Sequence, residues 1–299
     1  MTDTPAVHRT TPRGSRILHI LQILRQVAAR PSGAIGLALV CSHLLMAIFS
    51  AFIAPYDPIA TDSGNILHPP SWDYWMGTDH LGRDIFSRVL QGGRASLWVT
   101  SIATPIAILW GGMTGVYLGL AGGRTDEVIM RVVDAFLSLP GILPLMILVV
   151  VFGTGNEVLI PTLAFFFGIP VIRVARAAAH DVVARDFVSA ARARGHGRLS
   201  IMRRELLPNV LDTLMVEGAM RWSWMLLAFS SLSFLGFGVS PPTPDWGLMI
   251  ADGRIYMSLA LWGVLGPVIA LSSLIVGINL TADALAKTLG IDRTRKAVI

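Results

Sequence analysis

Long apolar stretches are the feature that most constrains how this chain can fold. A stretch of about 20 apolar residues matches a bilayer hydrocarbon core of roughly 30 Å, because a helix rises about 1.5 Å per residue. Ala34–Ala54, Leu97–Leu120 and Trp262–Leu280 meet this requirement directly. Only 14% of the 299 residues are charged, against about a quarter in a soluble domain. The sequence therefore predicts an all-α membrane protein.

Three further segments complete a prediction of six transmembrane helices. They are Ala135–Phe152, Val158–Ile172 and Val210–Phe237. The first contains Pro140 and Pro144, which neighbouring helices can accommodate. The second is short, but its helix can continue through Ala179. The third can span a membrane only if Glu217 and Arg221 face protein rather than lipid.

The distribution of charge predicts the orientation of these helices. Loops rich in Lys and Arg stay in the cytoplasm, and the Arg173–Arg204 segment carries eight arginines. The two tails are also basic, whereas the opposite side collects acids. These acids are Asp57, Asp62, Asp73, Asp79, Asp84, Glu157, Asp245 and Asp252. Both termini are therefore predicted to be cytoplasmic. The net charge of +5 reflects this topology, so no nucleic-acid partner is predicted.

The predicted organisation has four parts. They are a cytoplasmic N-terminal tail (1–32), a first transmembrane helix with a long external loop (33–95), a compact five-helix core (96–285) containing a basic loop (186–208), and a cytoplasmic C-terminal tail (286–299). The first 30 residues contain no short apolar core followed by a small-residue cleavage site, so no signal peptide is predicted. Cys41 is the only cysteine, which excludes an intrachain disulfide.

No catalytic pattern is visible in the sequence. The G-x-x-x-x-G-K-[ST] phosphate loop is absent, since Ala286 precedes Lys287 and Thr288 where a glycine is needed. His68 and His80 share a loop with acidic residues, but a solvated loop is favoured over a metal site. We therefore predict that the chain is not an enzyme and binds no metal or cofactor of its own.

The most unusual segment is "FVSAARARGHGRLSIMRRELLPNV", from Phe187 to Val210, which contains five arginines and one acid. Its Ala- and Arg-rich beginning favours a helix, and Gly195 and Gly197 permit a sharp reversal. A second helix is expected near Ser200, and Pro208 marks the beginning of the next span. An alternative is an amphipathic helix on anionic lipid, attracted by about 1 kcal/mol per arginine.

The order of residues in this segment resembles the E-A-A-x3-G-x9-I-x-L-P loop of ATP-binding-cassette (ABC) importer permeases. The residues that carry the resemblance, and that it implies contact an ATPase, are Ser189, Ala190, Ala191, Arg192, Gly195, Leu207 and Pro208. Ser189 replaces the glutamate of the pattern, and Glu205 replaces its isoleucine. The string "DFVSAARARG" is similar to the D-Y-V-x-A-A-R-A-x-G form of the peptide- and nickel-type permeases.

Two other segments extend the resemblance. Met76–Leu97, "MGTDHLGRDIFSRVLQGGRASL", and Ser233–Ile250, "SFLGFGVSPPTPDWGLMI", are similar to motifs of the second, "C-type" permease subunit of dipeptide, oligopeptide and nickel importers. Near the C-terminus, Ala282, Ala286 and Lys287 depart from the pattern of this family. The resemblance implies a type I importer permease with a cytoplasmic coupling helix, which forms half of a translocation pathway for peptides.

The resemblance also implies a location in the bacterial cytoplasmic membrane, partners and site residues. The implied partners are a second related permease, two ATPase subunits that carry ATP and Mg²⁺, an extracytoplasmic substrate-binding protein, and membrane lipid. Contacts in the external loop are expected from Asp79, Arg83, Asp84 and Trp246. The translocation pathway is expected to involve Glu217, Arg221 and Met225. Glu217 and Arg221 are four residues apart and share a helix face, so a purely structural ion pair is equally compatible with the sequence.

Two other functions remain open at this stage. The same architecture could import nickel or another small solute. A stand-alone secondary transporter would favour inverted repeats and intramembrane acids; the chain offers chiefly Asp134 and Glu217 as such acids, and it shows no visible repeat. That alternative also gives the basic Phe187–Val210 segment no role.

Overall fold

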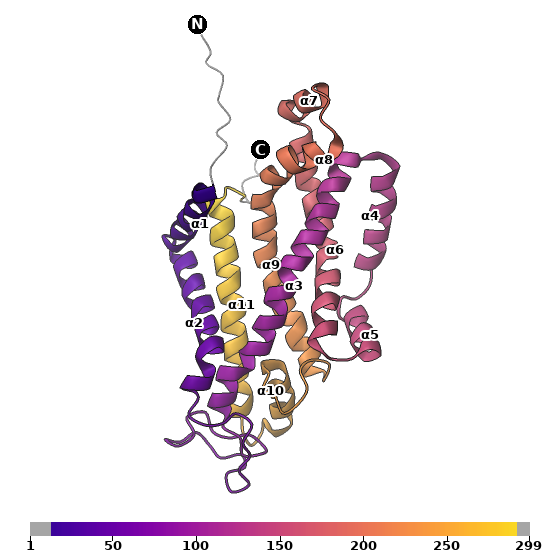
Figure 1. Cartoon of the computed structure of the whole chain (residues 1–299). Coiled ribbons are helices and arrows are strands. Elements are labelled where there is room, and N and C mark those ends of the chain that lie inside the picture. Colours follow the sequence, from indigo (N-terminus) through magenta and orange to yellow (C-terminus); the bar gives the residue numbers. More distant parts are fainter. Residues whose placement is uncertain (1–12, 292–299) are drawn as a thin grey trace.

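The computed structural model describes residues 13–291, with side chains from residue 21 onward, and this part of the chain is all-helical (Figure 1). The helices are α1 (Arg13–Ala28), α2 (Pro31–Ile53), α3 (Ile85–Ala121), α4 (Gly123–Leu137), α5 (Ile142–Phe152), α6 (Asn156–Val183), α7 (Asp186–Ala193), α8 (Arg198–Ile201), α9 (Leu207–Phe234), α10 (Trp246–Gly253) and α11 (Trp262–Thr288). A π-helical turn, Met202–Leu206, joins α8 to α9, and a 3₁₀ turn, Arg254–Tyr256, follows α10.

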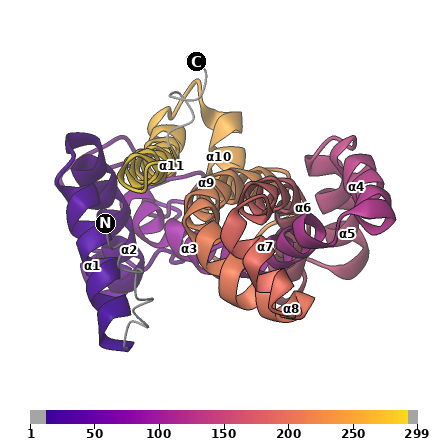
Figure 2. The ribbon, with the colours of Figure 1, turned by 90° about the horizontal axis from the view of Figure 1, so that it is seen from above.

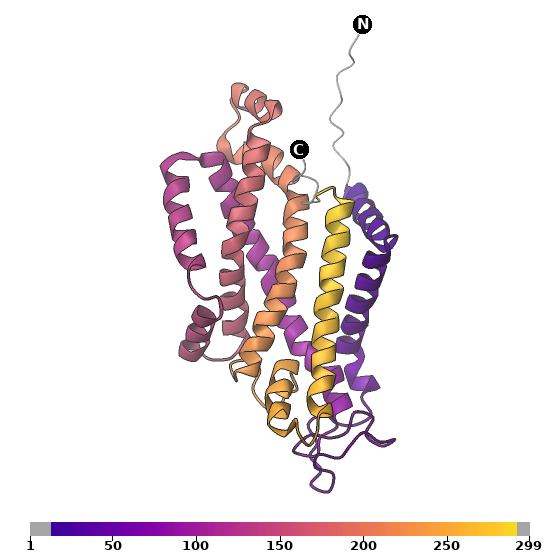
Figure 3. The same ribbon diagram turned by 180° about the vertical axis from the view of Figure 1, so that it is seen from behind.

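The long loop between α2 and α3 lies at one end of the bundle together with α10 (Figures 1 and 3). The opposite end carries α1, α7 and the C-terminal end of α11. The described part of the predicted N-terminal tail is thus mostly helical, because it contains α1. Residues 1–12 and 292–299 of the two predicted tails lie outside the described residues.

Four helices in the described chain are long and apolar enough to cross a membrane, namely α2, α3, α6 and α11. They match the predicted spans, although α3 begins at Ile85 rather than near Leu97. Asp84 explains the early start, because its side chain accepts a hydrogen bond from the Ser87 backbone N–H and caps the helix.

The predicted span Ala135–Phe152 is not one continuous helix, so this part of the prediction is wrong. α4 ends at Leu137 and α5 begins at Ile142, with a bend of 84° between the two helices. Pro140 lies in the break; its ring removes a backbone donor and disfavours helical geometry in the residue before it. If this bent pair is counted as one span, the number of candidate spans rises to five.

α9 has 28 residues, as many as α6, but it does not meet the same apolar composition. Its sequence includes Asp212, Glu217 and Arg221. The views from the side and from above show α9 beside α6 in the centre of the molecule, with α2 and α11 on one side and α4 and α5 on the other (Figures 1 and 2). α9 is therefore an internal helix of the bundle, flanked by more apolar neighbours.

Small residues allow α3 and α6 to pack closely. Gly111, Gly115 and Gly119 recur every fourth residue, so they lie on one face of α3. A Cβ atom added at Gly115 would collide with the backbone oxygen of Ile172, and one at Gly111 would collide with that of Gly168. Such small-residue faces let helix backbones approach in membranes. They hold α6 in the position from which α7 extends.

Replacing Gly115 with alanine is expected to destabilise the chain, because the new methyl group would push directly against a backbone carbonyl of α6. Overpacking costs typically about 1–3 kcal/mol, which exceeds the gain of up to about 1 kcal/mol from the better helix propensity of alanine. Gly218→Ala is the matched control, since its Cβ would meet only the Ile108 side chain at 3.4 Å. Thermal unfolding in detergent should place Gly115→Ala below the parent chain and Gly218→Ala at or above it; equal shifts would contradict the packing argument.

Candidate functional site

α7 presents one face to the exterior and buries the other. Ser189, Ala190 and Arg192 are exposed, whereas Val188 and Ala191 are completely buried. The two buried side chains belong to an apolar cluster that also contains residues of α6 and α9. The structure thus brings the α7 members of the predicted coupling set onto one short helix that is packed against α6.

The connection from α7 to α9 is helical for most of its length. The chain restarts as a helix at Arg198, near the predicted Ser200, and continues without a non-helical residue into α9. Leu207 is half-buried and Pro208 exposed at the beginning of α9. The π-helical turn ends two residues before Pro208, whose ring would clash with a carbonyl of a regular helix. Leu206 and Val210 are buried in the same apolar cluster as Val188, so one cluster includes side chains of α7 and of the beginning of α9.

Gly195 makes the reversal between α7 and α8. Its φ angle is +80°, in the left-handed region that side chains disfavour. No atom would lie within 4 Å of an added Cβ, so the requirement for glycine comes from the backbone and not from crowding. Gly197 has φ −66° and equally open surroundings. Of the two glycines, Gly195 therefore sets the geometry of the turn.

Glu217 and Arg221 form an ion pair on α9, with 2.6 Å between the Arg221 Nη2 and Glu217 Oε1 atoms. The Glu217 side chain is 5% exposed and that of Arg221 is 23% exposed. Arg221 also lines a cavity of about 440 Å³ between the α4–α5 bend, α6 and α9. Met225 is completely buried, with its sulfur 3.6 Å from the Thr104 hydroxyl. Of the three predicted pathway residues, Arg221 faces open space, Glu217 holds Arg221, and Met225 packs in the core.

The charged loop residues predicted to contact a partner form hydrogen bonds within the chain. Asp79 accepts a hydrogen bond from the Arg83 Nε at 2.7 Å, and the Arg88 Nε lies 3.7 Å from the same carboxylate. Arg88 also donates to the Pro58 carbonyl at 2.8 Å. Arg83 and Asp84 are almost completely buried. These side chains hold the loop in shape, and a contact with a partner through them stays a prediction.

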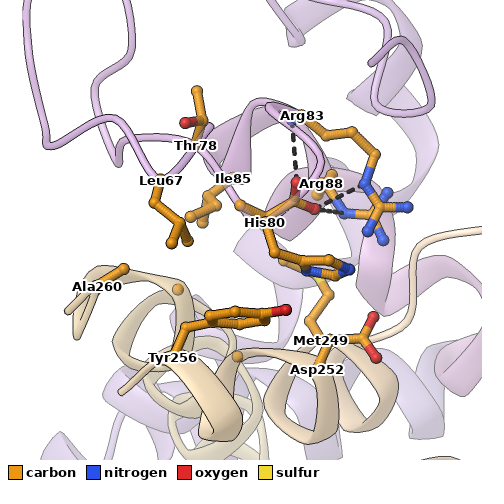
Figure 4. A pocket seen from close by; sticks show the side chains of 13 residues that line it. Leu67, Thr78, His80, Arg83, Ile85, Arg88, Met249, Asp252, Tyr256 and Ala260 are labelled. Atoms are coloured by element: carbon orange, nitrogen blue, oxygen red, sulfur yellow. Dashed lines mark hydrogen bonds and ion pairs between the residues drawn. The ribbon is translucent and has the colours of Figure 1, made fainter. Parts of the chain in front are cut away.

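A cavity of about 20 Å³ lies between this loop and the α10–α11 connection (Figure 4). Figure 4 shows the His80 ring facing that of Tyr256, and the two centroids are 5.3 Å apart. The volume holds roughly one water molecule, so this cavity is too small for a peptide. Trp72 and Trp75 are the most exposed large apolar side chains of this loop, and the sequence analysis did not single them out.

The Trp246 ring packs against two glycines of α3. Its indole N–H donates to the Val89 carbonyl at 2.9 Å. Cβ atoms added at Gly92 and Gly93 would lie 2.8 and 2.5 Å from the ring. Gly92 and Gly93 of the Met76–Leu97 motif thus leave room for Trp246 of the Ser233–Ile250 motif. The predicted role of Trp246 in an external contact is untested, and in this chain it is a buried anchor for α10.

Asp245, next to Trp246, is completely buried and caps α10. Its Oδ1 accepts from the backbone N–H groups of Gly247 and Leu248, and its Oδ2 accepts from the Ser96 hydroxyl at 3.0 Å. Burial raises the pKa of this carboxyl, because the ionised form loses its hydration.

Asp245→Ala is expected to destabilise the chain by about 2–4 kcal/mol, the sum of a lost helix cap and of buried donors left without an acceptor. Asp245→Asn should cost less than about 1 kcal/mol, because the amide oxygen can still cap α10 and the buried site no longer holds a group that ionises. Unfolding temperatures of the two variants in detergent measure the difference. A similar loss for both would mean that the charge, not the cap, stabilises α10.

A larger groove of about 870 Å³ lies near the same end of the bundle, between α2, α3, the beginning of α6 and the loop before α10. Its polar lining includes Gln91, Arg94, Ser101, Asn156 and Thr243. Gln91 and Arg94 lie within the Met76–Leu97 motif, but the sequence analysis did not select them as candidate site residues. Among residues 13–291, no three His, Cys, Asp or Glu side chains come together in a group that could hold a metal ion.

Comparison with known proteins finds similarity to transport permeases along most of the chain. Residues 111–291 match the family described as binding-protein-dependent transport system inner membrane component. Residues 21–70 match the N-terminal transmembrane domain of oligopeptide transport permease C.

Three relatives illustrate the similarity. A di/tripeptide transport system permease protein, DppC, of Pseudomonas aeruginosa is 35% identical over 88% of this chain and 89% of its own length. The dipeptide permease DppC of Escherichia coli is 37% identical over 87% of this chain and 89% of its own length. The nickel permease NikC of Escherichia coli is 34% identical over 87% of this chain and 94% of its own length. Since the matched region covers more than half of the sequence, this chain belongs to the family of binding-protein-dependent transport system inner membrane components, and it is a permease subunit of an ABC importer.

Proposed function

We propose that this chain forms half of the translocation pathway of an ATP-driven importer of dipeptides or short oligopeptides. The observation that carries this proposal is the 35–37% identity to dipeptide permeases over 87–88% of the chain. Nickel is a second candidate cargo, favoured by the similarity to the nickel permease. Uptake of a radiolabelled dipeptide and of radioactive nickel into proteoliposomes containing the complete complex separates the two. ATP-dependent entry of nickel but not of the dipeptide would overturn the peptide assignment.

The proposed topology has six membrane crossings. Five are α2, α3, the bent α4–α5 pair, α6 and α11, and the sixth is α9. The support for α9 is its length of 28 residues, its place beside α6, and the pairing of its Glu217 with Arg221, which lowers the cost of intramembrane charge. The end that carries α7 then faces the cytoplasm, which places both termini there as well.

The proposed partners follow from this arrangement. α7 docks in a groove on an ATPase, with Ser189, Ala190 and Arg192 facing the ATPase and Ala191 facing this chain, a helix-in-groove contact. ATP and Mg²⁺ belong to the two ATPase subunits, and this chain binds no cofactor. The external loop, including Trp72 and Trp75, faces the substrate-binding protein or the second permease. The surrounding lipid covers the exposed apolar faces of the outer helices.

The proposed mechanism uses α7 as a rigid piece. When the ATPases close on ATP, α7 moves with them, and the buried cluster around Val188 and Val210 carries this displacement to α9. α9 then shifts Arg221 and the cavity beside it. ATP can drive the change only by binding one state more tightly, and a swing from 1:99 to 99:1 needs about 5.5 kcal/mol.

One chain carries one α7, so it fills only one of the two grooves of an ATPase pair. We therefore propose a heterodimer with a second, related six-span permease, whose interface exceeds roughly 2,000 Å² as is usual for obligate pairs. Gentle purification from the native membrane followed by native mass spectrometry should show one copy of each permease. An active particle with two copies of this chain and no second permease would refute the heterodimer.

A further inference from the structure

Charged residues line the space between α4 and α6, a region not used in the proposal above. α4 carries Asp126, Glu127, Arg131 and Asp134, and α6 carries Arg173 and Arg176 opposite them. Ion pairs join Asp126 to Arg176 and Asp134 to Arg173 across the two helices. With Met130, these six side chains line an open groove of about 630 Å³. We call it the α4–α6 groove.

The two ion pairs across the α4–α6 groove differ in character. Arg176 binds both oxygens of Asp126, and these side chains are 30% and 10% exposed. Arg173 and Asp134 share a single contact and are 50% and 55% exposed. A bidentate, largely buried pair fixes geometry, so Asp126–Arg176 fastens α4 to α6. Asp134 and Arg173 are held by one contact and face the open groove, so a ligand in the groove can reach both charged groups.

The Asp134–Arg173 pair lies deep along the bundle. Arg173 is ten residues before the end of α6 at Val183, which corresponds to about 15 Å along the axis at about 1.5 Å per residue. Asp134 is eleven residues after the beginning of α4 at Gly123, a similar depth of roughly 16 Å. Ionisable residues at such a depth are rare, and they usually mark a pathway for substrates or ions.

A second cavity, of about 440 Å³, lies farther along the same two helices. It is lined by Phe136, two residues beyond Asp134, and by Pro170, three residues before Arg173. This cavity also reaches Arg221 on α9. The groove and the cavity therefore follow one another along α4 and α6. Each volume falls in the range of ligand sites, about 300–1,000 Å³.

We propose that Asp134 and Arg173 form a binding pair for the two charged ends of a peptide, an inference that rests on the proposed peptide cargo. A short peptide carries an ammonium group at one end and a carboxylate at the other. The planar guanidinium of Arg173 suits the carboxylate, and the Asp134 carboxylate accepts hydrogen bonds from the ammonium. Opening the pair around a zwitterion exchanges one ion pair for two, with no change in net charge and with no dependence on the peptide's side chains.

The probe for this site is a dipeptide of alanine and p-benzoylphenylalanine, which crosslinks on illumination. The nucleotide-free complex of both permeases and the ATPases, without the binding protein, is labelled and digested, and the labelled fragments are identified. Alanylalanine competes for the label, as do its N-acetylated and C-amidated forms. We expect label on α4 or α6 and about tenfold weaker competition by each blocked form, the loss of one charge-assisted contact.

Variants assign the two ends of the peptide. Arg173→Gln should abolish the difference between alanylalanine and its amide, and Asp134→Asn should abolish the difference between alanylalanine and its N-acetyl form. The matched controls are Lys287→Gln and Asp283→Asn, which disrupt an ion pair of similar exposure on α11, 42% and 51%. These controls should leave both differences unchanged.

Three results would overturn the inference. Label absent from α4 and α6 in a complex that transports the dipeptide would remove the site and leave the proposed function intact. Equal competition by free and blocked peptides in the parent complex would exclude recognition of the peptide ends.

A zwitterionic lipid headgroup has the same chemistry, so native mass spectrometry follows bound phosphatidylethanolamine. Loss of that lipid in the Arg173→Gln and Asp134→Asn variants, with unchanged peptide labelling, would assign the pair to lipid. Failure of the parent complex to transport any dipeptide would instead reject the proposed function.

Discussion

Valine in place of Gly195 is expected to reduce ATP-driven peptide uptake by about tenfold or more while the chain still inserts and folds. The left-handed φ of +80° at this position costs a side chain roughly 1–2 kcal/mol, and a β-branched residue is especially disfavoured there. The α7–α8 turn must then change, which moves α7 out of register with its docking groove. Because no atom lies within 4 Å of an added Cβ at this position, the substitution disrupts no core packing.

Gly197→Val is the matched control for this prediction. Gly197 lies two residues away with equally open surroundings, and its φ of −66° suits any residue. Uptake and ATP hydrolysis are measured on reconstituted complexes of both variants. We expect hydrolysis without uptake for Gly195→Val and near-normal coupling for Gly197→Val. Normal coupling in both variants would show that the turn geometry is not part of energy transmission.

Glu217→Ala is expected to destabilise the chain by about 3 kcal/mol or more, because it leaves Arg221 without its partner in the interior of the bundle. Arg221→Ala should have a similar effect, since Glu217 is the more buried of the two. A double change to glutamine at both positions removes both charges and retains hydrogen-bonding groups. It should recover most of the stability. Yield and unfolding temperature in detergent measure these effects.

The double variant also separates the two roles that the sequence left open for this pair. If the pair were only structural, the refolded double variant would transport peptide at the parent rate. We expect uptake to remain severalfold lower, because Arg221 lines the cavity of about 440 Å³ between α4–α5, α6 and α9. Full recovery of transport with recovered stability would remove Arg221 from the pathway.

The apolar runs predicted α2, α3, α6 and α11 because membrane spans can be recognised from length and composition alone. The bend between α4 and α5 could not be obtained in this way. Pro140 signals a break, but the angle of 84° depends on where the charged face of α4 meets α6. The early beginning of α3 did have a local signal, since Asp84 precedes an apolar helix in the position of an N-cap.

The candidate site shows the same division. The residue order placed Ser189, Ala190 and Ala191 on one short helix because helix and turn propensities are local. The sequence could not reveal that Met225 is completely buried, or that Arg83 binds Asp79 within the loop. Which partner a charged side chain chooses, and whether a helix face meets protein or open space, depend on residues far away in the chain. The α4–α6 groove was missed for this reason.

The central claim is that α7 couples this permease to an ATPase on the cytoplasmic side of the membrane. Cys41 is the only cysteine, so Cys41→Ser gives a background in which one site can carry a photoreactive maleimide. The two sites are Ser189→Cys on α7 and Trp72→Cys in the external loop, where Trp72 is 96% exposed. Crosslinking is performed in the transport-active complex, in inside-out vesicles, with and without ATP.

The probe at Ser189 should capture the ATPase with a yield that changes on addition of ATP, and the probe at Trp72 should not capture it. ATPase capture from Trp72, or its absence from Ser189 in a complex that transports peptide, would contradict the account.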